Sequence, residues 1–126
     1  MYIVIDETDR RPLYQQVVDE IKALIARGVL REGAALPPVR QVAADLGVNL
    51  NTIATAYREL QREGLINVRH GAGAVVASST AQEKSADELR KPLRAALTQL
   101  ILAGLPRSEI MAIVGDELRG LLKGSK

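Results

Sequence analysis

The chain contains no cysteine and only one histidine, and these two absences exclude several classes of function. Without cysteine there are neither disulfides nor thiolate ligands, and a single histidine, His70, argues against a histidine-based metal site. The sequence has no paired histidine and carboxylate motif and no phosphate loop of the Walker type. We therefore expect no enzymatic activity, no cofactor and no metal.

Long apolar runs are also missing. The longest apolar cluster near the C-terminus, residues 100–103, is far too short to span a bilayer. Residues 1–12 carry charges throughout and no apolar run follows them, so we expect no signal peptide. These features predict a soluble, cytoplasmic protein that does not associate with membranes.

The chain also lacks a marked excess of basic or acidic residues. The 17 basic residues face 15 acidic ones, and by our count residues 1–77 hold nine of each. A field that attracts nucleic acid must therefore come from the placement of charges and not from their sum. A length of 126 residues fits one domain, or one small domain with an appendage.

The stretch 39–57 predicts two short helices joined by a tight turn. Apolar residues at 39, 42, 43 and 46 share one face of the first helix. Gly47 suits a helix end that needs a positive φ, and Asn49 can cap the second helix. The inward residues of that second helix are expected to be Ile53, Ala56, Tyr57 and Leu60. The outward residues are expected to be Leu50, Asn51, Thr52, Thr55 and Arg58.

This arrangement is typical of the helix-turn-helix that reads the DNA major groove. Asparagine can bond adenine at two points, threonine can contact a thymine methyl or a phosphate, and arginine can pair with guanine or phosphate. Arg40, in the first turn of the first helix, points the same way and is a further candidate for DNA contact. The alternatives are a plain solvated face for the second helix, and a surface ion pair with Asp45 for Arg40.

The segment before this motif predicts one more helix. Residues 2–5 are expected to form a short strand or arm, and apolar residues recur at helical spacing from 13 to 25. We expect the outer face of this helix, which includes Gln15 and Gln16, to be solvated. Residues 28–30 and 33–38 are expected to form a loop that leads into the helix-turn-helix.

Two strands are expected after the helix-turn-helix, at 65–69 and 74–77, joined by a turn rich in glycine. Three helices followed by such a hairpin make a winged helix. Its tip carries Gly71 and Gly73, which allow close approach to a phosphate backbone, and Arg69 and His70 could donate to phosphate or to a base edge. A catalytic role for His70 is a weak alternative, because the sequence ties no nucleophile or carboxylate to it.

The remainder predicts a polar linker at 78–85 and two helices within 86–126. Asp87 is expected to cap or begin the first of them, and Ser108 to cap the second. A hairpin of this size rarely buries enough surface to fold alone, so we expect a second copy to cover it. The alternative is that it folds back on its own winged helix and leaves a monomer. The residues expected at the dimer interface are Leu89, Leu93, Leu97, Leu100, Ile101, Ile110, Ile113, Val114, Leu118 and Leu121.

Three segments that agree in order and spacing carry a family resemblance. They are PLYQQVVDEIKALIARGVL, then LPPVRQVAADLGVNLNTIATAYRELQREGLI, then RHGAGAVV. Over residues 11–77 the chain resembles the GntR-type winged-helix regulators, and its two-helix tail resembles their YtrA subfamily. The resemblance implies a dimeric bacterial transcription factor, usually a repressor, which in this subfamily often controls genes for ABC transporters.

The resemblance also implies which residues touch DNA. Arg40 matches a base-reading arginine, the residues Asn49, Asn51 and Thr52 match contacts at the start of the recognition helix, and His70 with Gly71 matches the wing tip. The chain departs from the family at several positions. Pro38 stands where serine is common, Leu50 stands where relatives carry a basic residue or proline, and Ala74-Val75 replaces the usual threonine and aromatic residue.

We therefore expect a mainly α fold with a small β-wing. Residues 1–77 form the winged helix-turn-helix, 78–85 the linker and 86–126 the dimerisation hairpin. The function expected is that of a dimeric repressor that binds double-stranded DNA at an inverted-repeat operator. The alternative is a winged-helix module that binds protein partners, and the balanced charge of residues 1–77 leaves this alternative open. A small-molecule effector, if there is one, is expected at the dimer interface or at its junction with the winged helix.

Overall fold

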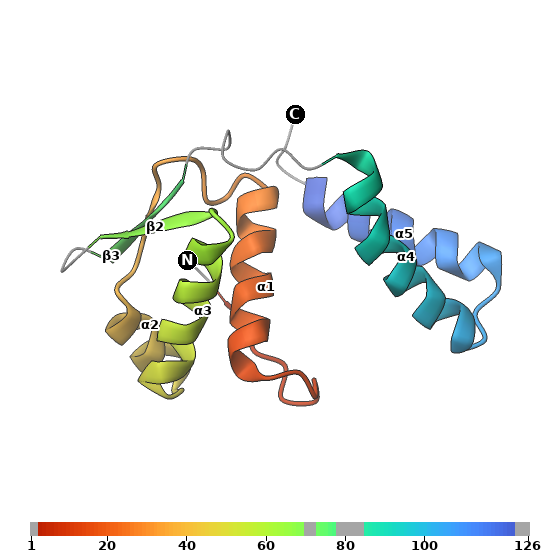
Figure 1. Cartoon of the computed structure of the whole chain (residues 1–126). Helices are drawn as coiled ribbons and strands as arrows, with labels where there is room; N and C mark the ends of the chain where they lie inside the picture. The colour runs from red at the N-terminus through yellow and green to blue at the C-terminus, as the bar shows by residue number, and fades with distance from the viewer. Residues whose placement is uncertain (1–2, 70–72, 78–84, 123–126) are drawn as a thin grey trace.

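A computed structural model of the chain describes residues 3–69, 73–77 and 85–122 (Figure 1). In chain order, the elements are α1 (Leu13–Ala26), β1 (Ala35–Leu36), α2 (Val39–Leu46), α3 (Leu50–Arg62), β2 (Ile66–Arg69), β3 (Gly73–Val76), α4 (Ala86–Leu102) and α5 (Arg107–Leu122). The helices α1, α2 and α3 gather beside the small sheet, whereas α4 and α5 form a separate hairpin. This mainly helical architecture with a small sheet confirms the predicted fold class.

Helix α3 lies at the centre of the winged helix, in contact with α1, α2 and β2. Its inward residues are those that the spacing predicted: Ile53, Ala56 and Leu60 have no exposed surface, and Tyr57 is 2% exposed. Because apolar residues at these positions share one side of a helix, burying them leaves the opposite side of α3 at the surface.

Helix α1 departs from its predicted stripe at two positions. Val17, Ile21 and Leu24 are buried as expected, but Val18 is also fully buried, whereas Leu13 is 40% exposed. The buried face of α1 is therefore turned slightly away from the predicted one. Leu13 at the start of α1 is left at the surface, and the helix packs against α3.

The sheet has three strands and not the two that the sequence predicted. Strand β3 lies in the middle, with β2 on one side and β1 on the other, and both pairs are antiparallel. Strand β1 falls in the segment expected to be a loop. It forms because Leu36 is buried, with 3% exposed, and because backbone bonds near it tie this segment to Val76. The prolines that follow cannot donate to a ladder, which limits β1 to two residues.

The described N-terminal residues form an arm and not a strand, and Gln16 holds this arm in place. Gln16 is 4% exposed, which corrects the prediction that it lies on a solvated face. Its Oε1 accepts from the amide of Asp6 at 3.0 Å, and its Nε2 donates to the carbonyl of Arg11 at 3.3 Å. Ile3, at 9% exposed, then joins the core.

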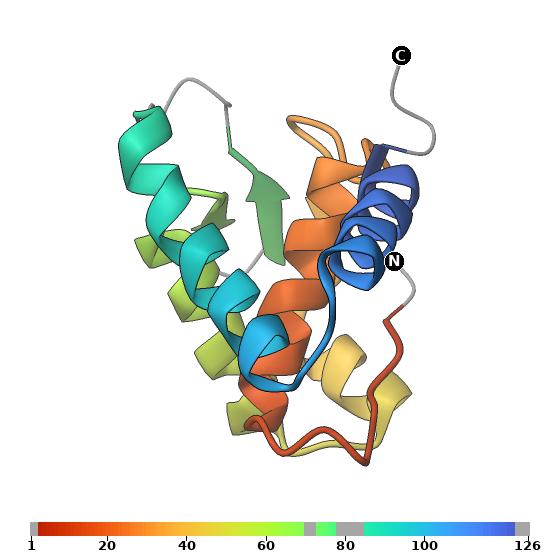
Figure 2. The same cartoon turned by 90° about the vertical axis from the view of Figure 1, so that its right-hand side faces the viewer.

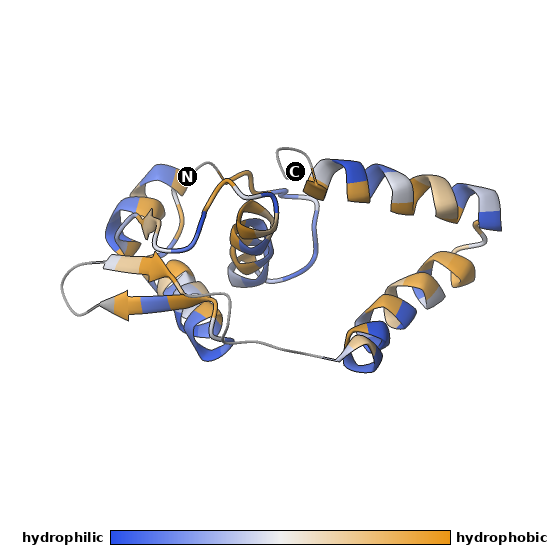
Figure 3. Ribbon diagram, turned by 90° about the horizontal axis from the view of Figure 1, so that it is seen from above, coloured by the Kyte–Doolittle hydropathy of each residue, from blue (hydrophilic) through white to orange (hydrophobic). Residues whose placement is uncertain are grey.

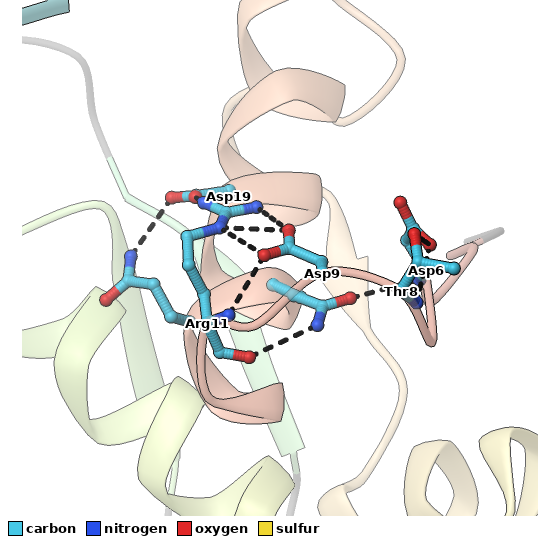
Figure 4. Close-up of polar contacts among 7 residues, drawn as sticks. Asp6, Thr8, Asp9, Arg11 and Asp19 are labelled. Atoms are coloured by element: carbon cyan, nitrogen blue, oxygen red, sulfur yellow. Dashed lines mark hydrogen bonds and ion pairs between the residues drawn. The ribbon is translucent and has the colours of Figure 1, made fainter. Parts of the chain in front are cut away.

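An ionic network at the surface supports the same arm. Arg11 donates to the carboxylates of Asp9 and Asp19, and this lowers the pKa of Asp9 below its ordinary value. Asp6 accepts from the hydroxyl and the amide of Thr8, and these bonds lower the pKa of Asp6 (Figure 4). The turn that leads into α1 is therefore fixed by the protein's own charges.

Helix α4 begins at Ala86, so the prediction that Asp87 caps or begins it is wrong. Ser85 caps α4 by accepting from the amide of Glu88 at 3.2 Å, so Asp87 lies inside the first turn and is not the cap. Helix α5 begins at Arg107, directly after Pro106, so Ser108 also lies inside its helix. Proline suits this place because the first amides of a helix have no partner within it.

None of the described residues of α4 and α5 is buried. The two helices diverge from their connecting turn and make few close contacts with each other (Figures 2 and 3). Hydrophobic residues nevertheless follow both helices, and α5 approaches α1 (Figures 1 and 3). A folded chain of this kind leaves an unusual amount of apolar helix surface in contact with water.

Candidate nucleic-acid interface

The turn between α2 and α3 has the geometry that a helix-turn-helix requires. Gly47 adopts φ 67° and ψ 34°, a left-handed conformation that glycine reaches at no steric cost. The amide of Val48 then bonds back to the carbonyl of Ala43 at 3.0 Å. Asn49 caps α3 as predicted, because its side-chain oxygen accepts from the amide of Asn51 at 2.8 Å.

A buried tyrosine fixes α3 against the entry to α2. The hydroxyl of Tyr57 donates to the carbonyl of Pro37 at 2.5 Å. Burial raises the pKa of Tyr57 to about 12, because an apolar environment disfavours the phenolate. The sequence indicated that Tyr57 faces inward but gave no sign of this hydrogen bond, which joins residues 20 positions apart.

The outward face of α3 is polar and carries the residues that the sequence predicted. Asn51 and Arg58 are exposed, and Thr52 and Thr55 are half-buried. Arg58 donates through Nη2 to the hydroxyl of Thr55 at 3.0 Å, which holds the guanidinium close to the helix. This face therefore presents an amide, hydroxyls and a cation, all of which can bond base edges or phosphates.

Arg40 lies in the first turn of α2 and is exposed. Among the described residues, no ion pair or hydrogen bond engages its side chain, so the alternative of a pair with Asp45 is wrong. Pro38 precedes the helix without a side-chain cap, as its replacement of serine predicted. Arg40 is therefore available to a partner outside the chain.

In the wing, Gly73 has a structural role that the sequence did not show. It adopts φ +77°, and a Cβ at this position would lie 3.3 Å from the carbonyl oxygen of Leu36. A side chain would thus press on β1, which pairs with β3. The backbone of Arg69 pairs with Gly73 across the hairpin, and His70 and Gly71 lie outside the described residues.

Two side chains that sequence reasoning missed hold the wing and α1 to the end of α3. Gln61 accepts from the amide of Val68 on β2 at 3.1 Å, and Lys22 on α1 pairs with Glu63 at 2.8 Å. No local pattern indicates such contacts, since each joins different elements. Together they fix the wing and α1 relative to the outward face of α3.

An open depression of about 370 Å³ lies between the start of α1 and the outward face of α3. One wall is formed by Pro12, Leu13 and Tyr14, at the start of α1, which were not predicted. The other wall is formed by the predicted site residues Asn51, Thr52 and Thr55. The surface beside the outward face of α3 is therefore concave. It could not be anticipated, because its two walls are almost 40 residues apart in the sequence.

A second cavity, of about 270 Å³, lies within the hairpin. It is lined by Leu97, Ile101, Leu105, Arg107, Ile110 and Met111. Of the residues predicted at the dimer interface, Leu97, Leu100, Ile110 and Val114 are half-buried in the single chain. The others remain exposed, namely Leu89, Leu93, Ile101, Ile113, Leu118 and Leu121.

Two further observations concern sites of other kinds. Within residues 3–69, 73–77 and 85–122, the carboxylate side chains do not gather into a group of three or more that could hold a metal ion. None of the helices in these same segments is both long enough and apolar enough to cross a membrane.

Comparison with known families identifies the fold's relatives. Residues 13–76 match the family described as "Bacterial regulatory proteins, gntR family". The chain is 30% identical over 127 residues to the "HTH-type transcriptional repressor YtrA" of Bacillus subtilis, covering 98% of this chain and 97% of that protein. This relative is a transcriptional regulator, in agreement with the prediction of a regulator and not an enzyme.

Solved structures of regulatory proteins also resemble this fold. A protein from Listeria monocytogenes EGD-e, described as a transcriptional antiterminator, superposes with a TM-score of 0.85 at 30% identity, over 97% of this chain and 93% of that one. The DNA-binding domain of AraR, in a complex with its operator ORR3, superposes with a TM-score of 0.52 at 27% identity. That match covers 61% of this chain and 93% of the AraR chain.

Proposed function

The chain belongs to the gntR family of bacterial regulatory proteins, and from this premise we propose that it is a dimeric repressor that binds an inverted-repeat operator. Its organisation would follow the boundaries expected above, with a DNA-binding domain at 1–77, a linker at 78–85 and a dimerisation region at 86–126. The AraR domain was solved on operator DNA, which supports double-stranded DNA as the partner of the winged helix.

The observation that carries the proposal is the division of α3 into two faces. Four buried side chains anchor it, and on the opposite side stand the exposed Asn51 and Arg58 and the half-buried Thr55. In the proposed complex this outward face enters the major groove, with Thr52 at its edge. The exposed Arg40 of α2, which has no ion pair among the described residues, would read a base or pair with a phosphate beside it.

Asn49 has a narrower role in this complex than the resemblance implied. Its side-chain oxygen already accepts from the amide of Asn51, so one lone pair of that oxygen is occupied and the side chain is held in its capping position. The wing supplies the remaining contacts. Arg69, His70 and Gly71 would reach the neighbouring phosphates or the minor groove, and Gly73 would shape the hairpin that carries them.

The exposed apolar surface of the hairpin is the argument for a dimer. Large apolar side chains on α4 and α5 remain half exposed or more, including Leu93 at 52%, Ile101 at 62% and Leu118 at 51%. A second copy offers the same apolar surface, so a two-fold interface would cover both at once. Two recognition helices at a fixed separation would then bind a symmetric site with additive energy.

The proposed direction of control follows from a relative, and the proposed target genes follow from the resemblance to the YtrA subfamily. The YtrA protein of Bacillus subtilis is named a transcriptional repressor, and we propose the same direction of control for this chain, with transporter genes as targets. The cavity within the hairpin, about 270 Å³, is smaller than the roughly 300–1,000 Å³ of most ligand sites. An effector would therefore bind where two hairpins meet, or where they join the winged helix.

Selection from random duplex DNA tests the proposal. The purified protein is expected to enrich a palindrome, and binding should weaken steeply with salt because phosphate contacts release counterions. The variant Arg40→Ala should bind the selected palindrome more weakly than wild type does. Arg31→Ala is its matched control, because Arg31 is also exposed but lies in the loop after α1. Recovery of no common sequence would contradict the proposal and favour the alternative, a winged helix that binds protein partners.

A further inference from the structure

Leu50 is a large apolar residue at the start of a recognition helix whose outward face is otherwise polar. It is the first residue of α3 and is 46% exposed. It stands between Asn49, which caps the helix, and the exposed Asn51. An exposed leucine on an ordinary surface needs no explanation, but this one lies on the face that would enter the major groove.

The polar groups near Leu50 are already partly engaged within the protein. A bidentate contact with adenine needs both the oxygen and the nitrogen of an asparagine side chain, and the oxygen of Asn49 accepts from a backbone amide at 2.8 Å. One turn further along, the hydroxyl of Thr55 accepts from Arg58 at 3.0 Å. Hydrogen-bond readout at the start of α3 therefore rests on the exposed Asn51, with the half-buried Thr52 at its edge.

Apolar side chains lie beside these engaged polar groups on α3. Leu50 and the half-buried Ala54 are four residues apart, so they lie on the same side of α3, one turn apart. The only apolar group that a base presents in the major groove is the C5-methyl of thymine. A leucine in this position therefore gains affinity from a thymine methyl and gains nothing from the polar edges of the other bases.

We propose that Leu50 is a specificity-determining residue, which packs on the C5-methyl group of a thymine in each operator half-site. This inference rests on the proposed function. Removal of one contacted methyl group should weaken binding by about fourfold, the value expected for one buried methylene-sized group. The effect should depend on the side chain at position 50, because the hydrogen-bonding edges of the base do not change.

The experiment uses the full-length protein and the palindrome that it selects. Each thymine of one half-site is replaced in turn by deoxyuridine, which lacks only the C5-methyl, and affinity is measured for wild type and for Leu50→Ala. We expect one replacement that costs wild type about fourfold and costs Leu50→Ala nothing. Leu50→Met keeps hydrocarbon at this position and should remain sensitive to the same replacement.

Val29→Ala is the control for loss of an exposed apolar side chain. Val29 is 57% exposed and lies in the loop after α1, so this variant should respond to deoxyuridine as wild type does. Thermal unfolding of each variant confirms that the winged helix is intact. If wild type and Leu50→Ala lose the same affinity at every replacement, the inference is wrong while the proposed function stands. If wild type selects no sequence, both are wrong.

Discussion

Replacing Ile101 by alanine should weaken the proposed dimer without unfolding either winged helix. Ile101 lies near the end of α4 and lines the cavity within the hairpin. It is 62% exposed in the single chain, so most of its side chain can be covered only by something outside that chain. The substitution removes apolar surface without adding charge, and alanine favours helix, so α4 itself should persist.

The size of the effect follows from this exposure. Burying a whole isoleucine side chain stabilises by about 1.5–3 kcal/mol, so covering the exposed 62% contributes about 1–2 kcal/mol. A two-fold interface contains the residue twice, which gives about 2–4 kcal/mol, or about 30-fold to 1,000-fold in the dissociation constant of the dimer. Alanine keeps the Cβ, so we expect a value in the lower part of this range.

Sedimentation equilibrium over a range of protein concentrations measures that constant for wild type and Ile101→Ala. Val29→Ala is again the control, since its side chain is 57% exposed but lies in the winged helix. Thermal unfolding followed by circular dichroism verifies that α1, α2 and α3 remain folded. A wild-type protein that sediments as a single chain at micromolar concentration would refute the reasoning, and so would equal dissociation constants for wild type and Ile101→Ala.

Four further predictions concern other parts of the chain. Arg40→Ala should weaken operator binding by about 1–3 kcal/mol and relax the base preference at one position of each half-site, as measured by selection with the variant. Stability should fall as pH rises from about 10 toward 12, because burial raises the pKa of Tyr57 from its ordinary 10.0 to about 12 and the folded state holds its proton longer. The loss should reach about 2–3 kcal/mol in urea unfolding and should be absent in Tyr57→Phe. Gln16→Leu should cost about 1–3 kcal/mol in the same assay, since it leaves a backbone amide and a carbonyl of the N-terminal arm unpaired. Gly73→Ala should cost about 1–2 kcal/mol, because φ is +77° there and the new Cβ would press on the carbonyl of β1. Unchanged midpoints in either variant would contradict the role assigned to that residue.

The helix-turn-helix could be predicted from the sequence because its signals are local. The spacing of Ile53, Ala56, Tyr57 and Leu60 defines one side of a helix, and all four are buried. Gly47 marks a left-handed helix end, and Asn49 caps the next helix, as their chemistry predicts. Such patterns need no knowledge of distant parts of the chain.

Predictions failed where a distant segment decides the outcome. Gln16 has the polarity of a surface residue, but the backbone of the arm offers it both a donor and an acceptor, so it is buried with its hydrogen bonds made. Strand β1 is too short to show an alternating pattern, and it exists because β3 provides an edge for it. Neither outcome is encoded within a window of neighbouring residues.

The sequence by itself therefore determined the three helices of the DNA-binding unit, their sharp turn, the polar outward face of α3 and the apolar character of α4 and α5. These are consequences of side-chain periodicity and of the few backbone conformations that glycine and capping residues favour. Only the tertiary structure decided that Arg40 has no partner among the described residues, that Gln16 is buried and that β1 completes the sheet. Each of these depends on which groups from distant segments come within bonding distance, and that is a property of the packed chain.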